Sequence, residues 1–211
     1  MNYLITAAGL GSRFLKESIK PPKPLIKVKG MELLLWSLKS FDFKSKDNLY
    51  IVTLKRDKVK EILLKKINLI YPQLNICWLE LEKCLNGQLL TSLEAINFFK
   101  IKGEILIHNC DTSYQLEYEN IKNILKKNFF GIIPYFNSEG ENWSFIEIKN
   151  DLITEVKEKE RISNNCSVGT YLFKDSEEFY NLANQYLKEI KKNSLKEFFI
   201  APFYDYAISK T

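Results

Sequence analysis

The sequence has a single histidine, His108, in its 211 residues. A Ser–His or Cys–His pair would have to use this residue, so most schemes built on a nucleophile and a base are excluded. His108 stands inside an apolar run, and we interpret it as a packed strand residue. A zinc site is not indicated either, because the cysteines share no CxxC spacing. We expect them to be reduced, buried thiols: Cys77, Cys84, Cys110 and Cys166.

The sequence also has no long apolar run and no concentrated basic stripe, and we expect no leader. No run of about 18 apolar residues occurs, and the N-terminus has no basic region followed by a cleavage site. We therefore expect a cytoplasmic protein with no membrane partner. The net charge of +5 is spread along the chain, without interleaved aromatic residues, so nucleic acid is not an expected partner. This positive excess suits polyanionic small-molecule substrates.

Strand-like apolar runs alternate with helical patterns in a chain that is 45% hydrophobic and 27% charged. Continuous apolar runs are typical of strands buried on both faces of a mainly parallel sheet. We predict an α/β fold with three layers, Rossmann-like, with a mixed, mainly parallel sheet. The predicted strands are 2–7, 48–54, 75–81, 104–109, 129–136, 143–149 and 167–173. The predicted helices lie near 31–42, 56–70, 88–100, 117–127, 176–192 and 198–209.

The second half of the chain has a different pattern. Residues 143–149 alternate between apolar and polar, a turn follows at 150–151, and residues 152–156 read as the partner strand of a hairpin. We expect a small antiparallel insertion here, over the open end of the sheet. Residues 1–211 form one predicted domain, with a nucleotide-binding half at about 1–115 and an acceptor-binding half at about 116–211.

The most informative segment is Ile5-Thr-Ala-Ala-Gly-Leu-Gly-Ser-Arg13, with Lys23 ten residues later. A strand runs into a loop of small residues, whose backbone N–H groups can approach an anion, and the arginine and lysine add positive charge. Phe14 stands where a dinucleotide fingerprint needs its third glycine, and no G-K-[ST] follows for a Walker A loop. The segment therefore predicts half of a nucleoside-triphosphate site.

Residues 4–30, from this loop through Pro22-Lys23-Pro24 to Gly30, resemble the signature of the nucleotidyltransferase family. The family includes sugar-1-phosphate nucleotidylyltransferases and phosphocholine cytidylyltransferases, and its fold is similar to glycosyltransferase A. The resemblance implies that the loop and Arg13 hold the triphosphate and that Lys23 neutralises charge during transfer. The loop residues so implied in binding are Ala8, Gly9, Gly11 and Ser12.

Residues 85–93 are explained by the start of an apolar helix, and they are also similar to the family's base-recognition element. The resemblance implies that Gly87 and Gln88 contact the base. Glu82 falls where relatives often place a glutamine that reads a pyrimidine edge; a solvated loop residue is the alternative. A glutamate only accepts hydrogen bonds, which suits the amino group of cytosine or N1 and N2 of guanine. Glu82 thus favours CTP.

A buried strand ends at Ile107-His-Asn-Cys-Asp-Thr112 and delivers Asp111 to the carboxyl edge of the sheet. The family resemblance implies that this aspartate binds Mg²⁺, a hard cation that takes carboxylate oxygen and bridges phosphates. An Asx turn at a strand end is the alternative. The D-x-D pair of glycosyltransferase A enzymes is absent, since Ser113 stands at its second position.

Two later segments resemble the acceptor side of the family. A charged turn ends in Glu158 and Lys159, and a strand near residue 170 carries Gly169. The resemblance implies that Glu158 binds polar groups of the acceptor, Lys159 its phosphate, and that Gly169 lets the acceptor approach the backbone. Trp143 either lines this pocket or belongs to the core. Asp205, in a segment similar to capsule-associated members, is the nearest candidate for a second metal ligand, and its match to the family pattern is poor.

These patterns predict a magnesium-dependent nucleotidyltransferase that joins a nucleotide to a small phosphorylated acceptor and releases pyrophosphate. The resemblance points to a sugar 1-phosphate that is activated for capsule or other surface polysaccharide. The short chain and Glu82 favour instead CTP with a non-sugar phosphate, such as phosphocholine or a phosphorylated amino acid or amide. A non-catalytic nucleotide-binding module and a homodimeric assembly remain open alternatives.

Overall fold

The computed structural model describes residues 1–115, 124, 129–190 and 197–210. Its main sheet has the strand order β5-β4-β1-β6-β12-β7. The first four of these strands run parallel, and β12 pairs antiparallel with both β6 and β7. The strands are β1 (Asn2–Ala7), β4 (Asn48–Leu54), β5 (Asn75–Leu81), β6 (Ile105–Asn109), β7 (Gly131–Ile132) and β12 (Thr170–Phe173). The prediction of a mixed, mainly parallel sheet is confirmed.

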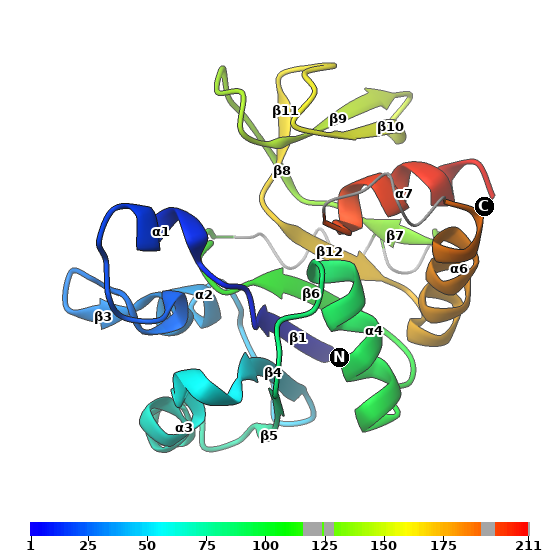
Figure 1. Cartoon of the computed structure of the whole chain (residues 1–211). Helices are drawn as coiled ribbons and strands as arrows, with labels where there is room; N and C mark the ends of the chain where they lie inside the picture. The colour runs from blue at the N-terminus through cyan, green and yellow to red at the C-terminus, as the bar shows by residue number, and fades with distance from the viewer. Residues whose placement is uncertain (116–123, 125–128, 191–196, 211) are drawn as a thin grey trace.

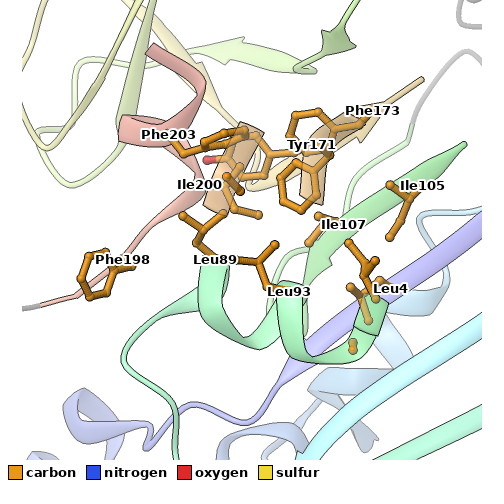
Figure 2. Close-up of a cluster of buried hydrophobic side chains, with 14 of the residues drawn as sticks. Leu4, Leu89, Leu93, Ile105, Ile107, Tyr171, Phe173, Phe198, Ile200 and Phe203 are labelled. Carbon is orange, nitrogen blue, oxygen red and sulfur yellow. The ribbon is translucent and has the colours of Figure 1, made fainter. Parts of the chain in front are cut away.

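Helices cover both faces of this sheet, which gives three layers (Figure 1). Alternate residues of β1 point to opposite faces: Tyr3 and Ile5 pack with one set of helices, and Leu4 packs with the other. The first set is α2 (Leu33–Leu38) and α3 (Val59–Ile70), and the second is α4 (Gln88–Phe99), α6 (Ser176–Glu189) and α7 (Ile200–Ile208). Figure 2 shows the second interface, where Leu89 and Leu93 of α4 meet Ile200 and Phe203 of α7.

A second sheet, with the order β10-β9-β11-β8, is antiparallel and lies above the main sheet in Figure 1, beside α7. Its strands are β8 (Tyr135–Asn137), β9 (Ser144–Lys149), β10 (Leu152–Glu158) and β11 (Asn165–Ser167). The expected hairpin is present, since β9 and β10 pair across a turn in which Asn150 and Asp151 both have positive φ. The predicted antiparallel insertion is confirmed.

Several element boundaries differ from the expectation. The run near 31–42 opens with β3 (Met31–Glu32), which pairs with β2 (Lys27–Val28) before α2 begins. The run at 129–136 divides between β7 and β8, and the run at 167–173 divides between β11 and β12. Short helical turns at α1 (Ser12–Lys16) and η1 (Lys23–Leu25) were not predicted, and the helix expected near 56–70 divides between η2 (Lys55–Asp57) and α3. The helix expected near 117–127 falls almost wholly outside the described residues.

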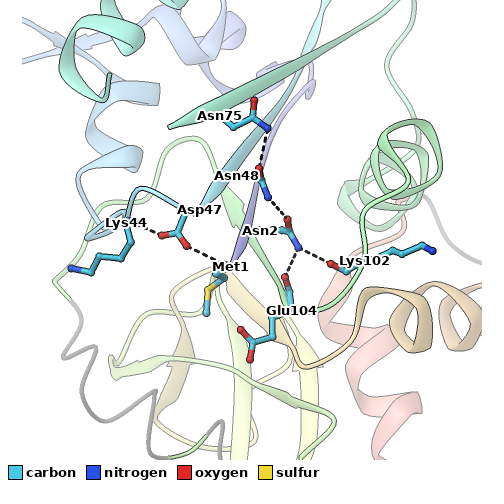
Figure 3. A network of polar contacts seen from close by, with 8 residues as sticks. All are labelled: Met1, Asn2, Lys44, Asp47, Asn48, Asn75, Lys102 and Glu104. Carbon is cyan, nitrogen blue, oxygen red and sulfur yellow. Dashed lines mark hydrogen bonds and ion pairs between the residues drawn. The ribbon is translucent and has the colours of Figure 1, made fainter. Parts of the chain in front are cut away.

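An asparagine ladder fixes the register at the amino ends of the parallel strands (Figure 3). Asn75 Nδ2 donates to Asn48 Oδ1 at 2.9 Å, and Asn48 Nδ2 donates to Asn2 Oδ1 at 3.1 Å. The amide of Asn2 then donates to the carbonyl oxygens of Lys102 and Glu104, both at 2.9 Å. A slip of one of these strands by one residue would break the ladder bonds of that strand and turn its core residues to the wrong face. Among the described residues, no helix has the length and apolar character needed to cross a membrane.

Candidate active site

The N-terminal loop, Lys23 and Asp111 come together at the carboxyl edge of the main sheet. The loop follows β1, and Asp111 follows β6, the strand that pairs directly with β1. Lys23 Nζ forms an ion pair with Asp111 Oδ2 at 2.7 Å, and both side chains are about a quarter exposed (23% and 29%). A Cβ atom at Gly11 would lie 3.2 Å from Lys23 Cβ, so the loop backbone packs against the lysine stem. The loop and Lys23, predicted from one segment, thus form one constellation with Asp111, predicted from another.

The surroundings of Lys23 keep it charged. Burial disfavours its ammonium form, but the acidic groups Cys110 and Asp111 outweigh burial and raise the pKa of Lys23. Burial also raises the pKa of the Cys110 thiol to about 11, so this thiol is neutral at pH 7 and Asp111 is the charged partner. Arg13, on α1, acts in the opposite direction on Lys23 as a neighbouring like charge. The site therefore concentrates positive charge beside one carboxylate.

The other loop residues differ in exposure. Ala8 is buried at the end of β1, whereas Gly9, Ser12 and Arg13 are exposed. A Cβ atom at Gly9 would meet no atom within 4 Å, so the loop is open on that side. The loop thus presents backbone and one guanidinium group to the surface, as a phosphate-binding loop requires.

Gln88 opens α4 and joins the ends of two strands. Its side-chain amide donates to Thr6 Oγ1 at 3.1 Å and to Asn109 Oδ1 at 2.9 Å. Thr6 is the next-to-last residue of β1 and Asn109 the last residue of β6. Sequence reasoning missed both partners, although their positions at strand ends are a signal that could have indicated them. Gln88 thereby fixes the start of α4 against the carboxyl edge of the sheet.

Gly169 packs directly on this arrangement. Its φ is +75°, and a Cβ atom there would lie 2.2 Å from Asn109 Nδ2, so only glycine fits without displacing Asn109. Its N–H donates to Ser167 Oγ at 3.1 Å, and its carbonyl accepts from Asn109 N at 3.3 Å. The close packing against Asn109 explains why residue 169 is a glycine. The contact of Gly169 with an acceptor stays a prediction.

A polar chain continues from here to the acceptor side. The Tyr171 hydroxyl is hydrogen-bonded to Ser167 and Ser144, and burial, as the main cause, raises the pKa of Tyr171 to about 12. Ser144 Oγ in turn donates to Glu158 Oε2. Glu158 is only 18% exposed and lies 3.6 Å from Lys159 Nζ. Glu158 and Gly169, predicted from separate segments, are thus joined through Ser144, Tyr171 and Ser167.

His108 is fully buried and has no access to a substrate. Its Nε2 lies 3.0 Å from the carbonyl oxygen of Thr112, which only accepts, so Nε2 carries the proton. Its Nδ1 accepts from the Thr170 hydroxyl at 2.7 Å, and Tyr114 donates to the same Thr170 oxygen at 2.8 Å. Burial lowers the pKa of His108 to about 4. It is a packed strand residue, as expected.

The remaining predicted residues have other partners. Glu82 pairs with Lys55 at 2.6 Å, with both side chains largely exposed, so this position offers donors as well as acceptors. Trp143 is 40% exposed and meets Phe136 edge to face, with ring centroids 5.0 Å apart. The cysteines are free, and Cys110 and Cys166 are buried while Cys77 and Cys84 are half-buried.

Asp205 lies on α7, where Oδ1 accepts from Val156 N at 2.9 Å and Oδ2 pairs with Lys157 Nζ at 3.1 Å. Within the described part of the chain, no group of three or more His, Cys, Asp or Glu residues could hold a metal. Asp205 as a second metal ligand therefore stays a prediction without support from its contacts.

No family model matches the chain, and no curated protein is significantly similar to it. Solved structures are similar over its whole length. A nucleoside-diphosphate-sugar pyrophosphorylase from Vibrio cholerae RC9 superimposes with a TM-score of 0.83 and 25% identity, over 100% of this chain and 88% of that one. The inositol-1-phosphate CTP transferase from T. maritima superimposes with a TM-score of 0.76 and 13% identity, over 100% of this chain and 82% of that one. A UDP-glucose pyrophosphorylase complexed with UDP-glucose superimposes with a TM-score of 0.76 and 17% identity, over 100% of this chain and 87% of that one.

These neighbours superimpose on the whole chain, and their printed names agree with the resemblance of residues 4–30. The chain has the nucleotidyltransferase fold, and its neighbours among solved structures are nucleotidyltransferases.

Proposed function

We propose that this protein transfers a nucleotidyl group from a nucleoside triphosphate to a small phosphorylated acceptor and releases pyrophosphate. The observation that carries the proposal is the Lys23–Asp111 ion pair, packed against Gly11 of the N-terminal loop. It brings an anion-binding loop, a charged lysine and a carboxylate to the edge where α/β folds bind ligands. The neighbours named above act on nucleotides and phosphorylated sugars or inositol, and they support the same reaction class.

In the proposed reaction an acceptor phosphate oxygen attacks the α-phosphorus in line. A new oxygen–phosphorus bond forms, the bond from the α-phosphorus to the bridging oxygen breaks, and pyrophosphate leaves with that oxygen. No base is required because the acceptor phosphate is already an anion at neutral pH. This agrees with His108, which is buried and uncharged. Positioning and charge neutralisation then supply the catalysis.

We assign roles in this reaction to some of the predicted residues. Backbone N–H groups of the loop bind the triphosphate, and Arg13 and Lys23 neutralise the leaving pyrophosphate and the transition state. Lys159 binds the acceptor phosphate, beside Glu158. Gln88 orders the start of α4, where we place the base.

The donor set fits a magnesium ion that arrives with the triphosphate. Mg²⁺ keeps several waters and is bound through one or two carboxylates together with substrate phosphates. Asp111 is one such carboxylate, partly exposed at the site, and Lys23 is its present partner. When bound, the ion would neutralise phosphate charge next to Lys23.

The base and the acceptor are a finer part of the proposal. Because Lys55 adds donors beside Glu82, this position can pair with an edge that needs both donors and acceptors. CTP is therefore not favoured over UTP or dTTP by Glu82. We propose a sugar 1-phosphate as the acceptor, for a cytoplasmic step that activates a surface-polysaccharide precursor. Phosphocholine or a phosphorylated amino acid or amide is the alternative.

Pyrophosphate release tests the proposal directly. The protein is incubated with Mg²⁺, each of CTP, UTP, dTTP, GTP and ATP, and each of glucose 1-phosphate, inositol 1-phosphate and phosphocholine. We expect one combination of triphosphate and acceptor to release pyrophosphate. The rate of this release should be about 10²–10³-fold lower in Lys23→Met and in Asp111→Ala. Lys20→Met is the matched control for charge, because Lys20 is exposed and nearby in sequence. Unchanged turnover in Lys23→Met and Asp111→Ala would refute these roles.

A second candidate function is a non-catalytic nucleotide-binding module. The contacts of Asp205 favour it, because they leave Asp111 as the one candidate carboxylate with a place at the loop. Tight triphosphate binding, measured by calorimetry, without pyrophosphate release across the acceptor panel would support this second function.

A further inference from the structure

A short segment near the C-terminus, residues 197–199, crosses the start of α4. The backbone of Phe198 pairs with the chain on both sides of Gly87, the residue before α4: Phe198 N donates to Asn86 O, and Leu89 N donates to Phe198 O, both at 3.0 Å. Gly87 has φ +110°, and a Cβ atom there would lie 2.3 Å from Phe198 O. The backbone of Phe198 thus occupies the space of a side chain at residue 87. We call residues 197–199 the strap.

The next residue of the strap reaches the acceptor side. Lys159 Nζ lies over the Phe199 ring, 5.0 Å from its centroid. Glu158 Oε1 is 3.6 Å from the same ammonium group, and the Lys159 side chain is 55% exposed. The backbone N–H of Lys159 donates to Trp143 O at 2.9 Å. An aromatic face and a carboxylate therefore hold the end of a side chain that is more than half exposed.

The strap continues into α7, which binds β10, the strand that ends just before this lysine. Asp205 of α7 accepts from Val156 N and pairs with Lys157 Nζ, and β10 ends at Glu158, next to Lys159. The C-terminal segment thus contacts the acceptor side at Phe199 and at Asp205, and the start of α4 at Phe198.

We propose that Phe199 is a positioning residue, which holds the Lys159 ammonium group in place for the acceptor phosphate. This rests on the proposed role of Lys159. A lysine has many rotamers, and restricting them before the acceptor arrives lowers the entropic cost of binding. The ring attracts the ammonium group through its negative face. Because the strap is anchored at Gly87, the position of the lysine follows the start of α4, where we place the base.

The steady-state test uses Phe199→Leu, which keeps an apolar side chain but removes the ring, and Phe199→Tyr, which keeps the ring. We expect Phe199→Leu to raise the acceptor KM about two- to fivefold, the equivalent of about 0.5–1 kcal/mol for an exposed cation–π contact. The kcat and the nucleotide KM stay near the parent values, and Phe199→Tyr restores the acceptor KM. The probes are glucose 1-phosphate and phosphocholine.

A double-mutant cycle separates positioning from a general effect on the fold. In the Lys159→Met background, Phe199→Leu should change the acceptor KM no further, since the group it positions is gone. Equal changes in both backgrounds, or a rise in nucleotide KM as large as that in acceptor KM, would overturn the proposal.

The contact itself is tested without turnover. Lysines are dimethylated with ¹³C-formaldehyde, and the Lys159 signal is assigned with Lys159→Arg. We expect an upfield ring-current shift for Lys159 in the parent protein and in Phe199→Tyr, which is lost in Phe199→Leu. A signal that is the same in all three would overturn the proposal. A parent protein that shows the shift but releases no pyrophosphate would instead refute the proposed function.

Discussion

His108 should make the stability of this protein depend on pH between 7 and 4. Burial lowers the pKa of His108 in the folded protein to about 4, against 6.5 for the exposed side chain. As the pH falls, the unfolded chain therefore takes up a proton before the folded chain does. The contribution of His108 leaves the free energy of unfolding unchanged well above pH 6.5. It lowers the free energy of unfolding as the pH drops from 6.5 to 4, and it causes no further change below pH 4.

The magnitude follows from the two pKa values. At pH 5.5 the folded protein remains unprotonated at His108 while most unfolded chains are protonated there, which lowers the free energy of unfolding by about 1.2 kcal/mol relative to pH 7. The complete loss near pH 4 is about 3 kcal/mol. Protonation in the folded state would also cost the bond that Nδ1 accepts from Thr170.

The assay is urea unfolding at pH 7.0 and 5.5, for the parent protein and for His108→Gln. A glutamine amide can donate to Thr112 O and accept from Thr170, and it does not titrate. Acidic pH also removes the stabilising contribution of carboxyl groups such as Glu32. Burial raises the pKa of Glu32, but its hydrogen bond with Lys66 lowers the pKa below the usual value. This contribution to the free energy of unfolding is lost equally in both proteins. We expect the parent to lose about 1 kcal/mol more than the variant. An equal loss in both would refute the assignment of this dependence to His108.

Three further predictions concern single contacts. Gly169→Ala should cost about 2 kcal/mol or more in urea unfolding, because its Cβ would strike Asn109, whereas Gly9→Ala, whose Cβ meets nothing, should cost much less. Asp205→Ala should lower stability by about 1–2 kcal/mol and leave the magnesium concentration for half-maximal activity unchanged; a large rise in that concentration would show that Asp205 reaches the metal. Asn48→Leu should cost about 1–3 kcal/mol by interrupting the asparagine ladder, and a midpoint equal to that of the parent would contradict the importance of the ladder.

Most of the main sheet could be predicted because its strands are continuous apolar runs. The bounds of β1, β4 and β5 agree with the expectation, since each strand is a largely apolar run closed by polar or turn residues; β1 and β4 are mostly buried, and β5, at the edge of the sheet, is mostly half-buried. The hairpin of β2 and β3 could not be predicted, because strands of two residues have no measurable period. The α1 turn was missed for a similar reason: it has five residues, none of them buried.

The candidate site was predictable as a set of positions but not as a set of contacts. Lys23 and Asp111 were each identified, and their parallel strands and loops imply a common edge, but the ion pair between them depends on side-chain placement. Asn109 was within reach of sequence reasoning as the last residue of a strand. The contact of Phe199 with Lys159 was not, because no local pattern relates residues so far apart.

The contact between Gly87 and Phe198 has a consequence for synthesis of the chain. These residues are 111 positions apart in sequence, and their backbones meet at the start of α4. A ribosome adds about 5–20 residues per second, so α4 leaves it roughly 6–20 s before its last partner is made. During that interval the first half of the chain can form its parallel strands, but the start of α4 lacks the strap. The nucleotide binding proposed above should therefore appear late, once residues 197–199 have been made.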